Sequence, residues 1–429
     1  MKKRIWKVLA VSGVVFLMFF SLLAIGCEPD VDEDLGEPII IGAPLSTGFL
    51  YGWVAERAIK LAVEEINEAG GVNVGDETRP LKAVIMDTRD LEAGVPVSEA
   101  LLVVEKLILE EEADFLIGGP VRSEAALAAM DLVSRHETVA IFSTGFLSPA
   151  FQQLVAEDYD THKYSFRITS SAPTMVGEML ALFDYLEEEY GFSKTAIKVQ
   201  DVAHARSGGE IMAEQLDNRG WDVTGPEVYP TGTLDYSDGL FRARDFGAEV
   251  IFIWMDMPES VILLKQHREM QLPSLPLGFI NAAEQPGFWE ASEGEGEFAI
   301  AHLVNAANAP VEVTALSMPF ASAYEDKWDL EPEGYGTSSS YQAVYTLVDA
   351  IERAGTIEPD AVITALEETD MVGVYGRVRF DENHQIIPSL DPEEGAIPQV
   401  IQWLDERRET VFPPAIATSP IMLPPWMEE

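Results

Sequence analysis

Short apolar runs alternate along most of this chain with segments whose apolar residues recur at helical spacing. The runs are rich in Val, Ile, Leu and Phe, which is typical of strands buried on both faces. In the first part of the chain the predicted strands are 39–42, 81–86, 115–118 and 139–142. The predicted helices between them are 53–69, 97–109 and 123–136. Such alternation indicates a parallel sheet covered by helices, and therefore an α/β fold.

A second series of the same kind begins near Phe166. Its predicted strands are 195–200, 223–229, 250–254 and 277–280, and its predicted helices are 174–190, 208–219 and 258–270. A further helix at 338–354 and a strand at 375–380 follow. Single hydrophobic cores stop growing at about 250–300 residues, so two series in a chain of 429 residues predict two lobes.

The first 27 residues have the composition of an export signal. Four basic side chains lie within the first seven residues, 8–25 is almost wholly apolar, and Gly26-Cys27 precedes an acidic stretch. The sequence Leu-Ala-Ile-Gly-Cys at 23–27 resembles the lipobox of bacterial lipoproteins, in which the cysteine thiol receives diacylglycerol. We therefore expect a signal peptide over 1–26, a lipidated Cys27 and an acidic tether over 27–37. An uncleaved anchor is the alternative, because a membrane span needs about 20 apolar residues.

The charge of the chain excludes several classes of partner. Its 73 acidic residues against 28 Lys and Arg give a net charge of −45, which repels nucleic acid and anionic lipid. A solvated acidic surface explains this excess, and attraction of a cationic ligand is the alternative. Cys27 is the only cysteine, so the fold needs no internal disulfide. No metal site is expected in the acidic tether, because Leu35 stands where a calcium loop needs glycine.

Several phrases of the sequence occur in an order that is typical of one family. They are IGAPLS at 41–46, AVEEINEAGGV at 62–72, LIGG at 116–119, IFSTG at 141–145, SYQAVY at 340–345 and GVYGRVRFD at 373–381. In these phrases the chain resembles the type I periplasmic binding proteins, specifically the branched-chain amino-acid (leucine/isoleucine/valine) binding group of ABC importers. The resemblance covers about 39–414.

The resemblance implies two doubly wound parallel-sheet lobes joined by a three-strand hinge. The expected boundaries are 38–167 and 297–372 for lobe one, 168–296 and 373–405 for lobe two, and a Pro-rich tail over 406–429. It also implies an extracytoplasmic, lipid-anchored monomer that captures a small polar metabolite by hinge closure and needs no cofactor. An amino acid, an amide or a carboxylic acid is the expected solute, and an ABC permease and its ATPase are the expected partners.

Two loops of lobe one are candidates for binding a carboxylate. Ligands of open parallel sheets bind beyond the carboxyl ends of strands, where helix N-termini present free N–H groups. The resemblance points to Arg122 or Ser123 in one loop, and to Ser148 with the backbone around Phe146 in the other. Arg122 replaces the usual small hydroxyl residue, and its guanidinium either pairs with a carboxylate or forms a surface ion pair. Ser123 and Ser148 also read as ordinary helix N-caps.

The other candidates face these loops. Tyr51 matches an aromatic residue that lines the family's cleft, or is an ordinary half-buried tyrosine. The family has an acid for the ligand's ammonium near Asn281, so either Asp256 binds that group or the ligand lacks it and Asn281 binds a hydroxyl or carbonyl. His204, in the loop after the strand at 195–200, either contacts the ligand or is simply exposed, as a lone histidine in a loop more commonly is. Trp254 stacks on the ligand or belongs to the core.

Two function classes other than solute transport are alternatives for such a chain. An enzyme is not expected, because the sequence contains no nucleophile elbow, phosphate loop, His-Glu-x-x-His motif or Cys-x-x-Cys pair. A ligand-sensing subunit with the same fold is the other alternative.

Overall fold

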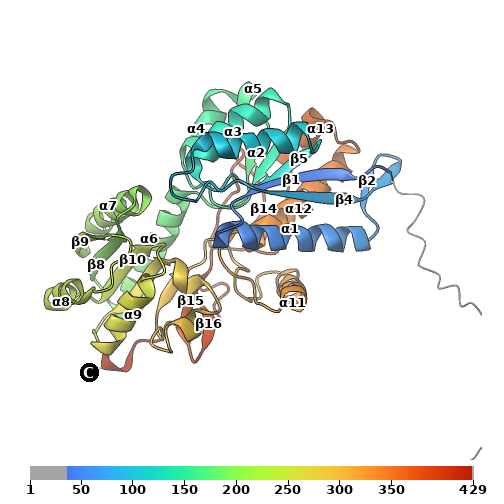
Figure 1. Ribbon diagram of the computed structural model, residues 1–429. Coiled ribbons are helices and arrows are strands. Elements are labelled where there is room, and N and C mark those ends of the chain that lie inside the picture. Colours follow the sequence, from blue (N-terminus) through green and yellow to red (C-terminus); the bar gives the residue numbers. More distant parts are fainter. Residues whose placement is uncertain (1–35, 428–429) are drawn as a thin grey trace, which may run out of the picture. The chain divides into compact units, whose positions relative to one another are not determined.

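The computed structural model describes residues 36–427, so the predicted signal peptide, Cys27 and most of the tether lie outside the described residues. The described part has two main sheets with helices on their faces (Figure 1). This confirms the predicted α/β fold. No helix within this part is long and apolar enough to span a membrane.

The first sheet is wholly parallel, with strand order β4-β1-β5-β6-β7. Its strands are β1 (Ile39–Leu45), β4 (Leu81–Asp87), β5 (Phe115–Gly118), β6 (Val139–Phe142) and β7 (Ser165–Arg167). Its helices are α1 (Leu50–Glu68), α2 (Val97–Leu109), α3 (Ser123–Arg135), α4 (Ala150–Glu157), α5 (Tyr159–His162), α11 (Ser317–Trp328), α12 (Thr337–Ala354) and α13 (Pro359–Glu367). In Figure 1, α1 and α12 lie on one face of this sheet and α2 and α3 on the other.

The second sheet has strand order β16-β15-β12-β11-β10-β8-β9 and ends in an antiparallel hairpin. Its strands are β8 (Lys194–Gln200), β9 (Asp222–Tyr229), β10 (Val250–Met255), β11 (Leu275–Ile280), β12 (Ile300–His302), β15 (Val400–Leu404) and β16 (Arg407–Phe412). Its helices are α6 (Ala172–Tyr190), α7 (Ala203–Asn218), α8 (Ser237–Phe246), α9 (Ser260–Glu269) and α10 (Phe288–Ala291). The short elements left are β2 (Val72–Val74), β3 (Glu77–Arg79), β13 (Met371–Gly373), β14 (Gly376–Val378), η1 (Asn281–Glu284) and η2 (Pro425–Met427).

The side chains of β10 show why this sheet is buried on both faces. Phe252 and Trp254 pack in one core with α6 and α7, and Ile253 and Met255 pack in another with α8 and α9. Successive side chains of a strand point to opposite faces, so a fully apolar strand needs a helical layer on each side. The continuous apolar run at 250–254 therefore correctly predicted a central strand.

Three segments belong to a different sheet or element from the one that the expected lobe boundaries give them. β12 pairs with β11 and β15 and so belongs to the second sheet, although 297–372 was expected in lobe one. Apolar residues of 374–397 pack in the core of the first sheet, although 373–405 was expected in lobe two. β16 forms a strand inside the expected tail, because it pairs along its whole length with β15.

Candidate functional site

The carboxyl ends of strands from both sheets border one cavity of about 330 Å³. Loops or helix starts that follow β1, β5 and β6 contribute from the first sheet, and those that follow β8, β10 and β11 contribute from the second. Its lining includes Tyr51, Arg122, Ser123, Phe146, Leu147, Met175, His204, Trp254, Asp256, Phe279, Glu284, Val304 and Tyr335. A cavity between the strand ends of two parallel sheets is where such folds bind small ligands.

The structure brings most of the sequence candidates to this cavity. The candidates that line it are Tyr51, Arg122, Ser123, Phe146, His204 and Asp256. Ser148 lies beside it and lines an adjoining groove. Asn281 reaches the site through a hydrogen bond that its Nδ2 donates to the Tyr51 hydroxyl. Their contact with a ligand stays a prediction.

Arg122 is held by the backbone rather than by a close ion pair. Its Nη1 and Nη2 both donate to the carbonyl of Val95 at 3.3 Å, and its backbone N–H donates to Asp90 Oδ2 at 2.6 Å. The Glu124 carboxylate is 3.8 Å from Nε and is largely exposed, so it screens the guanidinium weakly. Nε itself is buried and has no hydrogen-bond partner within 36–427. A ligand anion at the cavity wall would complete this group.

The two serines differ in their relation to the helix starts. Helix α3 begins at Ser123 with Arg122 as N-cap, so Ser123 does not hold the predicted N-cap position. Pro149, before α4, already has helical dihedrals, and Ser148 makes the side-chain bond of an N-cap, as predicted. Ser123 Oγ accepts the N–H of Ser148 at 3.3 Å, and Ser148 Oγ accepts the N–H of Ala150 at 3.2 Å. The first of these bonds fixes the loop after β6 against the loop after β5.

A fully buried arginine anchors the loop after β6 from behind. Arg167, at the end of β7, donates from Nη1 to the carbonyls of Phe146 at 2.7 Å and Ser148 at 2.8 Å. Its Nε donates to Gln385 Oε1, and its guanidinium lies 4.6 Å from the ring centroid of Phe151. Burial lowers the pKa of Arg167 to about 9, and the charge of Asp381 raises it in part, so the group is charged at neutral pH.

This anchor also determines where one amide of the loop points. A trans peptide places its N–H opposite its C=O, so holding the Phe146 carbonyl against Arg167 turns the N–H of Leu147 away from it. Leu147 lines the cavity, and its N–H forms no hydrogen bond in the described part of the chain. The loop therefore contains a backbone donor without an acceptor in residues 36–427, and it belongs to a residue that lines the cavity together with Ser123.

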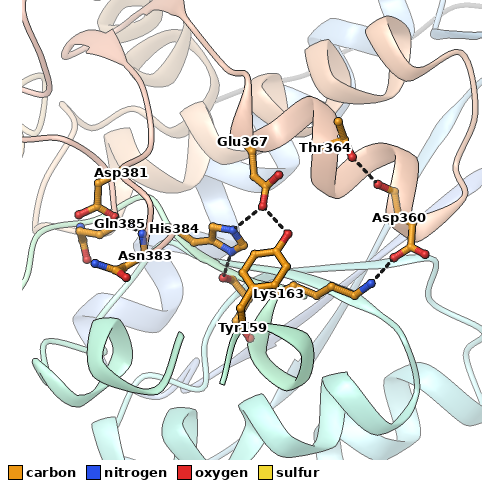
Figure 2. A network of polar contacts seen from close by, with 10 residues as sticks. Tyr159, Lys163, Asp360, Thr364, Glu367, Asp381, Asn383, His384 and Gln385 are labelled. Carbon is orange, nitrogen blue, oxygen red and sulfur yellow. Dashed lines mark hydrogen bonds and ion pairs between the residues drawn. The ribbon is translucent and has the colours of Figure 1, made fainter. Parts of the chain in front are cut away.

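A second network holds the segment that supplies Gln385 (Figure 2). His384 Nε2 lies 3.0 Å from Glu367 Oε1, which also accepts the Tyr159 hydroxyl at 2.6 Å. His384 Nδ1 is 3.1 Å from the carbonyl of Ser165, and the ring stacks on Phe166 at 4.0 Å between centroids. The segment is thereby fixed to β7 and α13, which keeps Arg167 in place.

On the opposite wall, His204 and Asp256 form a pair with 2.6 Å between Nε2 and Oδ2. Partial desolvation lowers the pKa of His204, but the hydrogen bond and negative charge of Asp256 outweigh it and raise the pKa above its ordinary value. Both side chains are more than a third exposed, so a ligand can reach them. Gln200 Oε1 accepts the N–H groups of Asp256 and Met257 at 2.9 and 3.1 Å and so fixes this loop.

Glu284 is the residue that the sequence did not single out as a contact. Its side chain is buried, and Oε2 has no hydrogen-bond partner among the described residues. Burial raises the pKa of Glu284 well above its ordinary value, and the charge of Asp256 raises it further. Tyr51 and Tyr335 stand beside it with ring centroids 4.0 Å apart. This end of the cavity thus presents a buried carboxyl with a raised pKa beside two aromatic rings.

Comparison with known proteins agrees with this architecture. A family model described as periplasmic binding protein matches residues 46–390. The chain belongs to this family. It is 24% identical to Leu/Ile/Val-binding protein homolog 7 of Brucella suis over 96% of this chain and 99% of that protein.

Two solved structures share the fold. The chain superposes on an ABC transporter substrate-binding protein from Sphaerobacter thermophilus with a TM-score of 0.69 and 19% identity, covering 87% of this chain and 96% of that one. It also superposes on the branched-chain amino acid transporter substrate-binding protein LivJ from Streptococcus pneumoniae in complex with isoleucine. That match has a TM-score of 0.69 and 18% identity and covers 88% of this chain and 100% of the other. In residues 36–427, no cluster of His, Cys, Asp or Glu is placed to hold a metal ion.

Proposed function

We propose that this protein is the extracytoplasmic substrate-binding lipoprotein of an ABC importer. The observation that carries the proposal is the cavity bordered by the strand ends of both sheets, in a chain of the periplasmic binding protein family. The cavity contains no nucleophile activated by a hydrogen-bonded base, so capture rather than turnover is the activity that its residues favour. The relatives' names, which refer to Leu/Ile/Val binding and to ABC transport, agree with this class.

The solute that fits is a small polar metabolite: an amino acid, an amide or a carboxylic acid. Arg122, the Ser123 hydroxyl and the free N–H of Leu147 provide donors for a carboxylate or carbonyl at one wall. At the other wall, the carboxyl groups of Glu284 and Asp256 accept hydrogen bonds from an ammonium, an amide or a hydroxyl.

Binding proceeds by hinge closure in this proposal. We place the crossings between lobes near 168–171, 303–305 and 397–399, where the chain passes from the core of one sheet to the core or strands of the other. Closure would bring the two walls onto the solute and remove water from its charged groups, which strengthens their interactions. The permease and ATPase would then respond to the closed form.

Anchoring rests on the sequence 23–27, and it has its own test. Cys27→Ser expressed in a bacterial host should move the protein from the membrane fraction to the soluble extracytoplasmic fraction, and mass spectrometry of the wild-type N-terminus should show a diacylated Cys27. An unmodified Cys27 in a protein that retains residues 1–26 would support the uncleaved anchor instead.

The solute-binding proposal is tested by a thermal-shift screen of amino acids, amides and carboxylic acids with the purified soluble form. A solute at 100 times its Kd adds about 2.7 kcal/mol to the free energy of unfolding, which shifts the melting temperature measurably. We expect at least one solute to do this and to reduce the radius of gyration in X-ray scattering. Chemical conversion of a solute, or binding without closure, would refute the proposal.

A further inference from the structure

A second hollow adjoins the cavity. It has a volume of about 580 Å³, runs between α6 and α7, and is bounded at one end by the loop of Leu147 and Ser148. It shares Ser123, Leu147, His204 and Trp254 with the cavity, so the two spaces lie next to each other. An amino acid in the cavity would leave this groove unfilled.

The chemistry of the groove differs from that of the rest of the surface. Its walls are formed largely by Leu147, Pro173, Val176, Leu180 and Ile211, and Ile211 is 44% exposed. His204, at the junction with the cavity, is the one ionisable side chain among the residues that line it. In a chain with 73 acidic residues, an accessible groove without a carboxylate is a surface suited to an apolar occupant.

A glycine inside a helix keeps the groove open. Gly177 lies in the interior of α6 and is exposed, and a Cβ built on it would meet no atom within 4 Å. Gly208, across the groove in α7, differs, because a Cβ there would lie 2.1 Å from the ring of Trp254. The contact with Trp254 therefore requires a glycine at 208, whereas no packing contact requires one at 177. Glycine is less favourable than nearly every other residue in a helix interior, so the glycine at 177 lowers helix stability without a packing reason. The missing side chain at 177 leaves room for something other than this chain.

We infer that the groove binds an unbranched aliphatic chain of the same solute whose polar head occupies the cavity, so that the transported class is an elongated amphipathic acid or amino acid. This inference rests on the proposed function and specifies its solute. The four shared lining residues put the groove within reach of one molecule bound in the cavity, and the absence of carboxylates from the groove's lining suits an aliphatic chain. The polar head would lie between Arg122 and Glu284, and the chain would pass His204 and Trp254 toward Gly177.

The test uses two homologous series of probes, straight-chain carboxylates from butanoate to decanoate and straight-chain 2-amino acids of the same lengths. Titration calorimetry with the soluble protein should show affinity rising about fourfold for each added methylene that enters the groove, since each buried methylene contributes a roughly constant free energy. The rise should stop when the chain exceeds the groove.

Two variants separate the groove from the cavity. Gly177→Leu fills the groove and should abolish the rise with chain length, while the affinity of the shortest bound probe changes less than twofold. Glu187→Leu places the same side chain at an exposed position of α6 away from the groove and should leave the whole series unchanged. Thermal unfolding should show that both variants are folded.

The outcomes are distinct. Affinities that do not depend on chain length, or a Gly177→Leu variant that weakens short and long probes equally, would overturn the inference. A protein that closes on a compact solute but binds neither series would also overturn it and leave the proposed function intact. Groove-dependent binding of a permease segment instead of the probes would assign the groove to a protein partner, which also contradicts the inference.

Discussion

Replacing Arg167 with methionine tests whether a buried charge shapes the ligand loop. Arg167→Met keeps a long apolar side chain and removes the donors to Phe146 O and Ser148 O. Each buried carbonyl left without a donor lowers the stability by about 1–3 kcal/mol. The variant no longer has to bury a cation that lacks a hydrogen-bonded carboxylate, and this gain offsets part of that loss. We therefore expect the free energy of unfolding to fall by about 2–4 kcal/mol.

The effect on binding follows from the peptide between residues 146 and 147. Once the Phe146 carbonyl is released, the contact that turns the N–H of Leu147 away from Arg167 is lost. A hydrogen bond to a charged group contributes about 1.5–3 kcal/mol, so the affinity for a carboxylate should fall about tenfold to a hundredfold. The affinity for a neutral amide of the same shape should fall less, because its carbonyl gains less from that donor.

Urea unfolding measures the stability, and calorimetry with a carboxylate and its amide measures the selectivity. Arg167→Lys keeps the charge but cannot reach two carbonyls and Gln385 together, so it should lie between the wild type and Arg167→Met. Arg135→Met makes the same chemical change at an exposed position without a hydrogen bond in the described residues, and it should change neither quantity. Equal losses for carboxylate and amide would reduce Arg167 to a structural residue, and unchanged affinity would refute the reasoning.

Three other residues at the site and one in the core give further predictions. Arg122→Ala should weaken an acidic solute by about 1.5–3 kcal/mol in calorimetry, and unchanged affinity would remove Arg122 from the site. Asp256→Asn should weaken a solute with an ammonium group and hardly affect one without it, again by calorimetry. A carboxyl whose pKa is raised in the folded state contributes stability at low pH, and this contribution is lost as pH rises. Glu284→Gln should therefore raise the free energy of unfolding of the solute-free protein at neutral pH but not below about pH 4, as measured by urea unfolding. Burial lowers the pKa of His267 to about 4, so the free energy of unfolding of the wild type should fall by about 3 kcal/mol as pH falls from 6.5 toward 4. His267→Gln should lack this fall in urea unfolding, and a variant that keeps it would contradict the prediction.

The sequence predicted the sheets well because their central strands are apolar throughout. The runs at 115–118 and 139–142 coincide with β5 and β6, and the predicted helix 97–109 coincides with α2. A strand buried on both faces must be continuously apolar, and this leaves an unmistakable pattern. The ends of these strands then located the ligand loops, since ligands of such sheets bind at their carboxyl edge.

The missed strand β16 lacks such a pattern. Its sequence, Arg-Arg-Glu-Thr-Val-Phe, begins with charged residues, and the turn before it is Asp405-Glu406 rather than Asn-Gly. Both turn residues nevertheless have positive φ, of 48° and 69°, as a two-residue hairpin requires. Pairing with β15 overrides the local preference here, and a single sequence does not reveal that pairing.

The sequence did not predict the roles of Glu284 and Arg167, because these roles depend on the tertiary surroundings of the two side chains. The resemblance to the family pointed to Asn281, but Glu284, three residues later in the 3-10 turn η1, is the residue of this turn that lines the cavity. Arg167 follows Phe166 in a short strand, where a charged residue ordinarily ends the strand in solvent. Its burial becomes visible only when the loop of Phe146 and the segment of Gln385 are folded over it.

The contact between Tyr51 and Asn281 bears on how the site closes. Tyr51 comes from α1 beside the first sheet and Asn281 from the turn after β11 in the second, and they are hydrogen-bonded to each other. The two walls therefore touch at this point, close to Glu284. If this contact is kept in the proposed hinge closure, the walls would pivot about it, and the groups farthest from it would approach one another most. His204 and Asp256 of one wall and Arg122 and Ser123 of the other line the same cavity, so closure would remove water from the charges of Arg122 and Asp256 and strengthen their interaction with a solute.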